Sequence, residues 1–131
     1  MLITREMDYT LRILRALHQS GQLSATSVAR DEHLQKAITL KLLNRLLSAG
    51  IVESRRGVSG GYLLKIPCEQ LKLYDLFQML GESTELNRCQ RSSYQCENRP
   101  DGSCGVCQEF NRIQAVLEME LQRTPLSEIL H

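Results

Sequence analysis

The stretch that decides the fold is IVESRRGVSGGYLLKI, residues 51–66. Two short β-prone runs, residues 51–56 and 62–66, flank the glycine-rich run Gly57-Val58-Ser59-Gly60-Gly61. Such runs on either side of a glycine-rich turn predict a β-hairpin, here with a loop somewhat longer than a tight turn. The sequence therefore places a short hairpin near the middle of the chain.

Three helices are predicted before this hairpin. In residues 3–18 the apolar side chains recur every three or four positions, which is the spacing of one helix face. Ser24 suits the N-cap of a short helix over residues 25–31, and Gly50 suits the end of a helix over residues 35–49. Three helices followed by a hairpin predict a winged helix-turn-helix, so we expect a mostly α fold of the α+β class.

Two further helices and a polar segment are predicted after the hairpin. Residues 71–80 are amphipathic, and residues 82–108 are rich in cysteine and in turn-forming residues. A last helix over residues 109–123 carries an apolar stripe with no obvious partner in the chain, formed by Phe110, Ile113, Leu117 and Leu121. We expect this to be a long dimerisation helix, and the alternative is that it docks on its own winged helix.

The charge distribution follows the same division of the chain. Residues 1–66 hold ten Lys and Arg against five Asp and Glu, whereas residues 67–131 hold six against ten, giving net charges of +5 and −4. We therefore expect a DNA-binding winged helix-turn-helix over residues 1–66 and a sensor and dimerisation region over residues 67–131. Two solvated faces of a single domain would give the same charges.

The residues expected to contact DNA lie on the third helix and on the hairpin. The third helix of a winged helix usually enters the major groove, where Gln can bond adenine and Lys can reach guanine or phosphate. An arginine beside a glycine-rich loop suits a narrow minor groove. The candidates are Gln35, Lys36, Thr39, Lys41, Arg55, Arg56, Ser59 and Gly60.

Length and composition exclude several classes of protein. A chain of 131 residues has room for one domain with an appended element, and no stretch is apolar enough to cross a membrane. We expect a cytoplasmic protein without a membrane partner. No phosphate-binding glycine loop, nucleophile elbow or paired carboxylates are visible, so we expect no enzyme. A small thiol oxidoreductase is the enzyme alternative, because Cys104 and Cys107 form one Cys-x-x-Cys pair.

Four of the five cysteines, Cys89, Cys96, Cys104 and Cys107, lie in one short segment. In a reducing compartment such a cluster binds metal or senses redox state more often than it forms structural disulfides. A four-cysteine zinc site is an alternative, although zinc ribbons typically use two Cys-x-x-Cys pairs. A reversible disulfide between Cys104 and Cys107 needs no cofactor at all. We also expect the positive end of the last helix to lower the pKa values of Cys104 and Cys107.

Four motifs together resemble a known family. They are residues 2–12 (LITREMDYTLR), residues 49–52 (AGIV), the wing RGVSGGYLL at residues 56–64, and the end PLSEIL at residues 125–130. The sequence resembles the Rrf-two-type transcription regulators of bacteria over nearly its whole length. This resemblance implies a homodimer held by the long last helix, two winged helices on a two-fold operator in double-stranded DNA, and in many members an iron-sulfur cluster.

The resemblance also implies which residues hold such a cluster. Cys89, Cys96 and Cys104 occupy the place of the three ligand cysteines, with six and seven intervening residues where relatives usually have slightly shorter gaps. The fourth ligand is Cys107 or, from the other subunit, Asp8. We expect a transcription regulator whose DNA affinity is set by an iron-sulfur cluster or by thiol redox state. A cofactor-free repressor controlled by a partner protein or a small molecule is the alternative.

Overall fold

A computed structural model describes residues 2–131. The winged helix consists of helices α1 (Arg5–Ser20), α2 (Ala25–Asp31) and α3 (Lys36–Ser48), with strands β1 (Val52–Arg55) and β2 (Gly61–Leu64). Helices α4 (Leu73–Met79) and α5 (Gly105–Leu121) follow. Short 3-10 turns interrupt the connections and the tail: η1 (Cys68–Gln70), η2 (Arg88–Gln90) and η3 (Leu126–Glu128). The predicted winged helix-turn-helix is confirmed.

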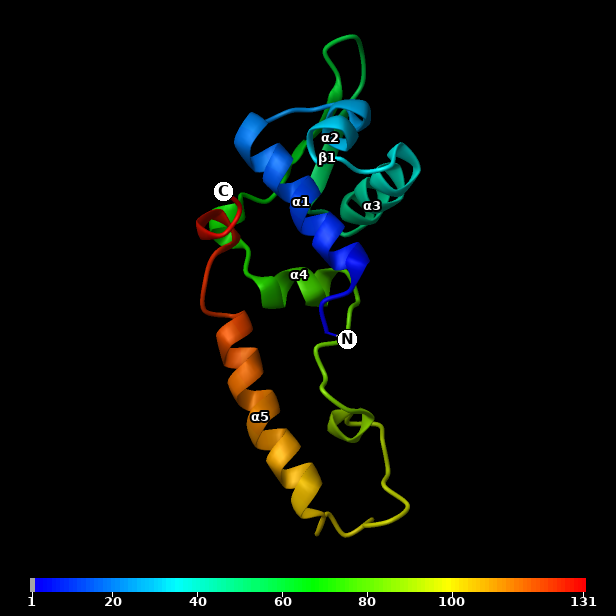
Figure 1. The fold of residues 1–131 in the computed structure, drawn as a ribbon, viewed down its shortest axis with the longest axis vertical. Helices are drawn as coiled ribbons and strands as arrows, with labels where there is room; N and C mark the ends of the chain where they lie inside the picture. The colour runs from blue at the N-terminus through cyan, green and yellow to red at the C-terminus, as the bar shows by residue number, and fades with distance from the viewer. Residues whose placement is uncertain (1) are drawn as a thin grey trace.

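The molecule is elongated, with the winged helix at one end and α5 extending away from it (Figure 1). After α4 the chain passes along the side opposite α5, through η2 and the cysteine segment, and enters α5 at the far end of the molecule (Figure 1). The N-terminal end of α5 therefore lies far from the wing, and its C-terminal end returns toward α4.

Side-chain caps fix where the first two helices begin. The backbone N–H of Met7 donates to Thr4 Oγ1 at 3.1 Å, so α1 begins at Arg5 and Ile3 lies before the helix. Ser24 caps α2 as predicted, accepting from the Ser27 N–H at 3.1 Å. Each cap satisfies a backbone donor that has no partner within the helix.

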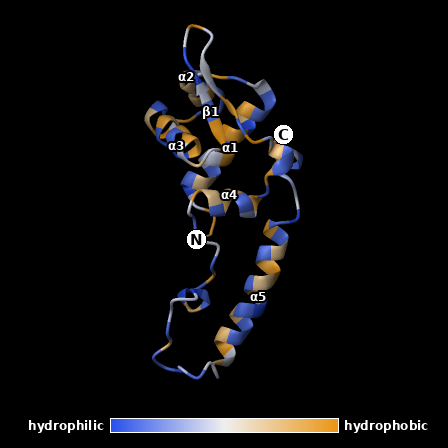
Figure 2. Ribbon diagram, turned by 180° about the vertical axis from the view of Figure 1, so that it is seen from behind, coloured by the Kyte–Doolittle hydropathy of each residue, from blue (hydrophilic) through white to orange (hydrophobic). Residues whose placement is uncertain are grey.

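The hydrophobic core lies where α1, α3 and β1 meet, and hydrophobic residues concentrate there in Figure 2. Ile13 and Leu14 of α1 pack with Leu42 and Leu46 of α3, all fully buried, and Phe77 of α4 joins the same cluster. The amphipathic stripes read from the sequence therefore do face a common core. In contrast, α5 joins this core only at its C-terminal end, where Leu121 belongs to the cluster and Leu117 packs against it, and the rest of the helix extends away (Figure 2).

The wing is a two-stranded antiparallel sheet in which Val52 pairs with Leu64 and Arg55 with Gly61. An isolated bridge joins Leu23 to Tyr62, with N–H···O distances of 3.0 and 2.8 Å, and attaches the wing to the turn before α2. A Cβ on Gly61 would lie 2.6 Å from the Leu23 carbonyl oxygen, so only glycine fits this close approach.

The last helix begins four residues earlier than predicted, at Gly105 instead of residue 109. Cys104 has an extended backbone conformation, and its carbonyl accepts the first helical hydrogen bond from the Gln108 N–H at 3.0 Å. Cys107 consequently lies in the first turn of α5. At the other end, the tail packs as expected: Leu126 and Leu130 are buried, and the Leu126 N–H donates to Leu71 O at 2.8 Å.

None of the helices in residues 2–131 combines the length and the apolar character that crossing a membrane would require.

Candidate functional site

The outer face of α3 is the first candidate surface. Gln35 and Lys36 are exposed at its N-terminal end, and the Gln35 side chain makes no capping hydrogen bond to the described helix. Asn44 is exposed on the side of α3 that carries Lys41, three residues earlier, and not on the side of Gln35, nine residues earlier. The sequence analysis did not include Asn44 among the DNA-contact candidates, although its spacing from Lys41 places both residues on one face. Its amide can bond a base edge in the same way as that of Gln35.

Thr39 does not belong to this surface, so the prediction that it contacts DNA is wrong. Its side chain is fully buried, and its hydroxyl donates to the Gln35 carbonyl at 3.0 Å. The spacing of Thr39 from Leu42, Leu43 and Leu46 shows the reason, because all four lie on the core-facing side of α3.

Lys41 and Arg45 form a network of ion pairs at the edge of α3. Lys41 Nζ lies 2.5 Å from one oxygen of Glu6, and Arg45 lies 3.3 Å from the other. Hydrogen bonding from Lys41 holds the pKa of Glu6 below its ordinary value, with the Arg45 charge adding to the effect. Arg45 also donates to Glu82 Oε1 at 2.8 Å and to Leu80 O at 3.0 Å. Lys41 and Arg45 thus have protein partners on α1 and on the chain that leaves α4.

The wing presents two arginines at the end of β1. Arg55 is exposed and lies 3.6 Å from Glu53 of the same strand, a distance typical of a weak surface pair. Arg56 is exposed and forms no ion pair with any residue of the chain from 2 to 131. Arg56 is therefore the better placed of the two to pair with a phosphate or to enter a groove.

The loop of the wing has a structural requirement of its own. A Cβ on Gly60 would lie 2.3 Å from the Arg55 carbonyl oxygen, which backbone atoms cannot accommodate. The Gln22 side chain donates to the Ser59 carbonyl, which ties the loop to the turn before α2. Gly60 thus shapes the loop, while the Ser59 side chain remains exposed.

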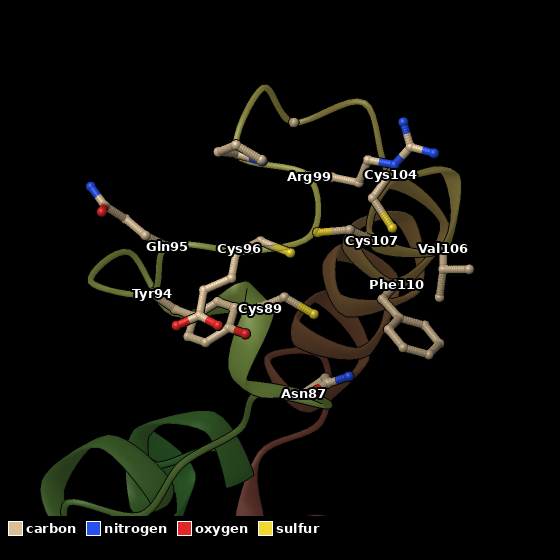
Figure 3. A pocket seen from close by; sticks show the side chains of 13 residues that line it. Asn87, Cys89, Tyr94, Gln95, Cys96, Arg99, Cys104, Val106, Cys107 and Phe110 are labelled. Carbon is tan, nitrogen blue, oxygen red and sulfur yellow. The ribbon is translucent and has the colours of Figure 1, made fainter.

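The second candidate site is a cavity of about 560 Å³ at the N-terminal end of α5. Figure 3 shows that Cys89, Cys96, Cys104 and Cys107 gather around it from three different segments. Cys89 comes from η2, Cys96 from the following loop, and Cys104 and Cys107 from the start of α5. All four thiols are free and partly buried.

Cys107 has the most distinctive electrostatic surroundings of this group. Burial raises its pKa, and Cys89, followed by Cys104 and Cys96, raises it further. The expected lowering of the pKa is therefore wrong for Cys107, whose surroundings raise it through desolvation and the neighbouring thiols. The side-chain amide of Asn111, one turn along α5, lies 4.0 Å from Cys107 Sγ.

The donor set fits a soft metal centre, although the sulfur atoms do not yet converge. Among residues 2–131 no three His, Cys, Asp or Glu side chains are close enough together to hold a metal ion. Four thiols around one cavity are nevertheless the ligands that iron-sulfur clusters and structural zinc use. Residues 91–103, which carry Cys96, form no helix or strand.

Two other candidate residues lie away from this cavity. Asp8 pairs with Arg12 at 3.0 Å, is about half exposed, and is absent from the cavity lining. Cys68 is fully buried in the core, where burial raises its pKa to about 11. Cys68 is therefore a packing residue.

The predicted dimerisation stripe lies only partly against its own chain. Leu121 is buried and Phe110 and Leu117 are half-buried, whereas Ile113 is 38% exposed. The apolar side chains left exposed on α5 are Val106, Ile113, Val116 and Met119. A single chain thus leaves four apolar side chains of this helix exposed.

A winged helix with an exposed α3 face and an arginine-bearing wing defines a helix-turn-helix DNA-binding protein. The comparison with protein families agrees: residues 3–131 match the Rrf2 family, described as an iron-dependent transcriptional regulator. The chain belongs to the Rrf2 family. It is accordingly a transcriptional regulator and not an enzyme.

Individual relatives and solved structures support this assignment. An Aquifex aeolicus protein designated an HTH-type transcriptional regulator is 18% identical over all of this chain and 92% of its own length. The global cysteine regulator CymR of B. subtilis has a similar fold, with a TM-score of 0.76 and 22% identity over 99% of this chain and 96% of CymR. T. potens IscR also has a similar fold, with a TM-score of 0.75 and 21% identity over 99% of this chain and 86% of IscR. The chain spans about half the length of several other curated relatives that it matches.

Proposed function

We propose that this chain is a homodimeric, DNA-binding transcription regulator of the bacterial cytoplasm, and that an iron-sulfur cluster in the cysteine cavity sets its affinity for the operator. The observation that carries the proposal is the gathering of four free thiols, separated by up to eighteen residues of sequence, around one cavity. The iron-dependent character of the family supports the choice of cofactor.

DNA binding is proposed for the outer face of α3 and for the wing. Gln35 and Lys36 would read the major groove at the N-terminal end of α3, and Asn44 is exposed further along the helix, beside Lys41. Arg55, Arg56 and Ser59 would contact phosphates or a narrow minor groove, with the loop shaped by Gly60. Lys41 can reach a phosphate only by leaving Glu6, so we give it a smaller share of the binding free energy.

Dimerisation is proposed through the stripe of Phe110, Ile113, Leu117 and Leu121 on α5. Leu121 is already buried in its own chain, so the added burial falls on Ile113 and on the half-buried Phe110 and Leu117. Full burial of an exposed side chain of this kind contributes about 1.5–3 kcal/mol, and a second copy of the same helix offers a matching apolar surface. A two-fold arrangement would place the two α3 helices on half-sites about 34 Å apart. We therefore propose two parts with separate roles. Residues 1–66 bind DNA, and residues 67–131 carry the sensing and dimerisation functions.

The proposed cluster ligands are Cys89, Cys96 and Cys104, with Cys107 as the fourth. When bound, an iron-sulfur cluster supplies a centre that reacts with oxidants or changes its redox state. The protein's contribution is to supply four thiolates from η2, the following loop and the start of α5, and to shield them partly from solvent. Asp8 of the second subunit is the alternative fourth ligand, and zinc or metal-free thiols are the alternative states of the cysteines.

Purification without oxygen tests the proposal, combined with visible spectra and analysis of iron and acid-labile sulfide. We expect broad visible absorption with stoichiometric iron and sulfide in the wild type. Cys107→Ser should lose the chromophore, and the matched variant Asp8→Ala should keep it. Zinc or no metal in the wild type would overturn the cluster. Loss of the chromophore in Asp8→Ala alone would move the fourth ligand to the other subunit.

A further inference from the structure

One face of α5 is polar and turns toward the cysteine segment, in contrast to the apolar stripe beside it. Cys107, Asn111, Gln114 and Glu118 follow one another at spacings of four, three and four residues, which places them on a single helix face. Gln114 is the buried member, with only 7% of its surface exposed. It lies among the apolar residues of the helix but is not one of the residues that line the cysteine cavity.

Every polar group of the Gln114 side chain has a partner. Oε1 accepts from the backbone N–H of Leu86 at 2.9 Å. Nε2 donates to the backbone carbonyl of Thr84 at 3.0 Å and to Glu118 Oε1 at 2.9 Å. One amide group thus bonds both a donor and an acceptor of the same backbone segment, 28 to 30 residues away along the chain.

The segment held in this way leads directly to the first cysteine of the site. Thr84 is itself buried, and Cys89 follows Leu86 by three residues, a span of at most about 10 Å. The attachments beyond Gln114 are weaker. Gln90 lies 3.5 Å from Asn111, and Asn111 lies 4.0 Å from the Cys107 sulfur. Gln114 therefore provides the strongest connection between the chain that carries Cys89 and the helix that carries Cys107.

We infer that Gln114 is a positioning residue of the cysteine site, and that its amide fixes the Thr84–Leu86 backbone on α5 so that Cys89 faces Cys107. The inference rests on the proposed role of the cysteines as a joint site, and it adds a residue that contacts none of them. It also accounts for a buried polar side chain on a helix face that could otherwise have been apolar.

The chemistry requires an amide at this position. A glutamate would replace the Nε2 donor by an acceptor oxygen that faces the Thr84 carbonyl and the Glu118 carboxylate, which repel it. A methionine has a similar length but would leave the Leu86 N–H and the Thr84 carbonyl without partners in a buried place. Both substitutions should release the segment, and Gln114→Met does so without adding charge.

The test uses the full-length protein without metal, in a Cys96→Ser/Cys104→Ser background that leaves Cys89 and Cys107 as the accessible thiols. Diamide oxidises this pair: two S–H bonds break, one S–S bond forms, and the diamide is reduced to the hydrazine. We expect Gln114→Met to slow disulfide formation about tenfold and to speed hydrogen exchange in a peptide covering residues 84–90 by a similar factor. Gln122→Met, at the exposed C-terminal end of α5, is the matched control and should change neither rate.

Unchanged rates in Gln114→Met, or equal changes in the Gln122→Met control, would overturn the inference. Circular dichroism and the thermal midpoint of each variant show whether the fold is kept, and Gln114→Glu provides a second variant if Gln114→Met is unfolded. The measurements need no metal. Failure to find iron and sulfide in the wild type would therefore refute the proposed cluster while leaving the position of Cys89 relative to Cys107 testable.

Discussion

Arg45 of α3 donates a hydrogen bond of 2.8 Å to Glu82, the residue at which the chain leaves α4 for the cysteine segment. The same guanidinium bonds the Leu80 carbonyl and pairs with Glu6 of α1. A helix expected to lie in the major groove is thus tied directly to the beginning of the proposed sensor segment. This contact gives the two halves of the chain a physical means of influencing one another.

Replacing Arg45 with alanine should lower the stability of the fold and weaken the effect of the metal centre on DNA affinity. The side chain is one-third exposed and makes charged hydrogen bonds, so we expect the free energy of unfolding to fall by about 1–2 kcal/mol. The difference in DNA affinity between the metal-loaded and metal-free protein should shrink as well. Chemical denaturation and fluorescence anisotropy measure the two effects.

Lys41→Ala is the matched control, because Lys41 shares Glu6 with Arg45 but makes no contact with Glu82. Its exposed pair should contribute less than about 1 kcal/mol. Equal loss of coupling in both variants would show that Glu6, and not the Glu82 contact, connects the two halves.

A second prediction concerns the exposed arginine of the wing. Arg56→Ala should weaken operator binding and, if the side chain contacts phosphate, reduce the salt dependence. With about eight phosphate contacts in the dimer, log K against log salt should have a slope of roughly −7, and removing one contact per subunit should lower its magnitude by about 2. Titrations at several salt concentrations supply both numbers. Wild-type affinity and slope in Arg56→Ala would exclude this wing residue from the interface.

The loop of the wing gives a third prediction. Gly60→Ala must displace backbone, because its Cβ would lie 2.3 Å from the Arg55 carbonyl oxygen, so DNA affinity should fall by at least tenfold. Gly105→Ala is the control, since a Cβ there meets nothing within 4 Å. Fluorescence anisotropy measures the DNA affinity, and hydrogen exchange of residues 52–64 reports the displacement of the wing backbone. An unaltered wing and affinity in Gly60→Ala would contradict the structural reason for this glycine.

The dimer interface is tested most cleanly at Ile113. This side chain is 38% exposed in the single chain, so Ile113→Asp should spare the chain's own core while placing a charge in the interface. Sedimentation should show monomers that bind DNA weakly. Ala115→Asp, an exposed position on a different face of α5, should remain dimeric. A dimer of unchanged stability in Ile113→Asp would locate the interface elsewhere.

The sequence predicted much of the fold because local signals determine it. The spacing of apolar residues located the helices, Ser24 and Gly50 marked helix ends, and the glycine-rich run located the wing. The start of α5 was misplaced because Cys104-Gly105-Val106-Cys107 resembles a turn, whereas the helix already begins at Gly105. Gly105 lowers helix propensity without preventing the first turn.

The candidate sites were predicted less completely, because their roles depend on long-range contacts. Nothing local to α3 indicates that Lys41 pairs with Glu6, 35 residues earlier in the chain. Two signals were nevertheless present in the sequence. Thr39 shares the spacing of the buried leucines, and Gln114 interrupts the apolar stripe three residues before Leu117 and seven before Leu121. A polar residue that shares the spacing of buried apolar residues is expected to be buried itself and to have its polar atoms hydrogen-bonded.

The most direct test of the account is the DNA affinity of one preparation measured with and without its metal centre. The duplex is selected from random sequence by the metal-loaded and metal-free protein in parallel, so that neither state is favoured, and anisotropy is recorded without oxygen. If the metal centre sets operator affinity, the two affinities differ by about 5- to 150-fold, and a Cys104→Ser variant behaves like the metal-free protein in both preparations. Equal affinities of the two states for every selected duplex would contradict it.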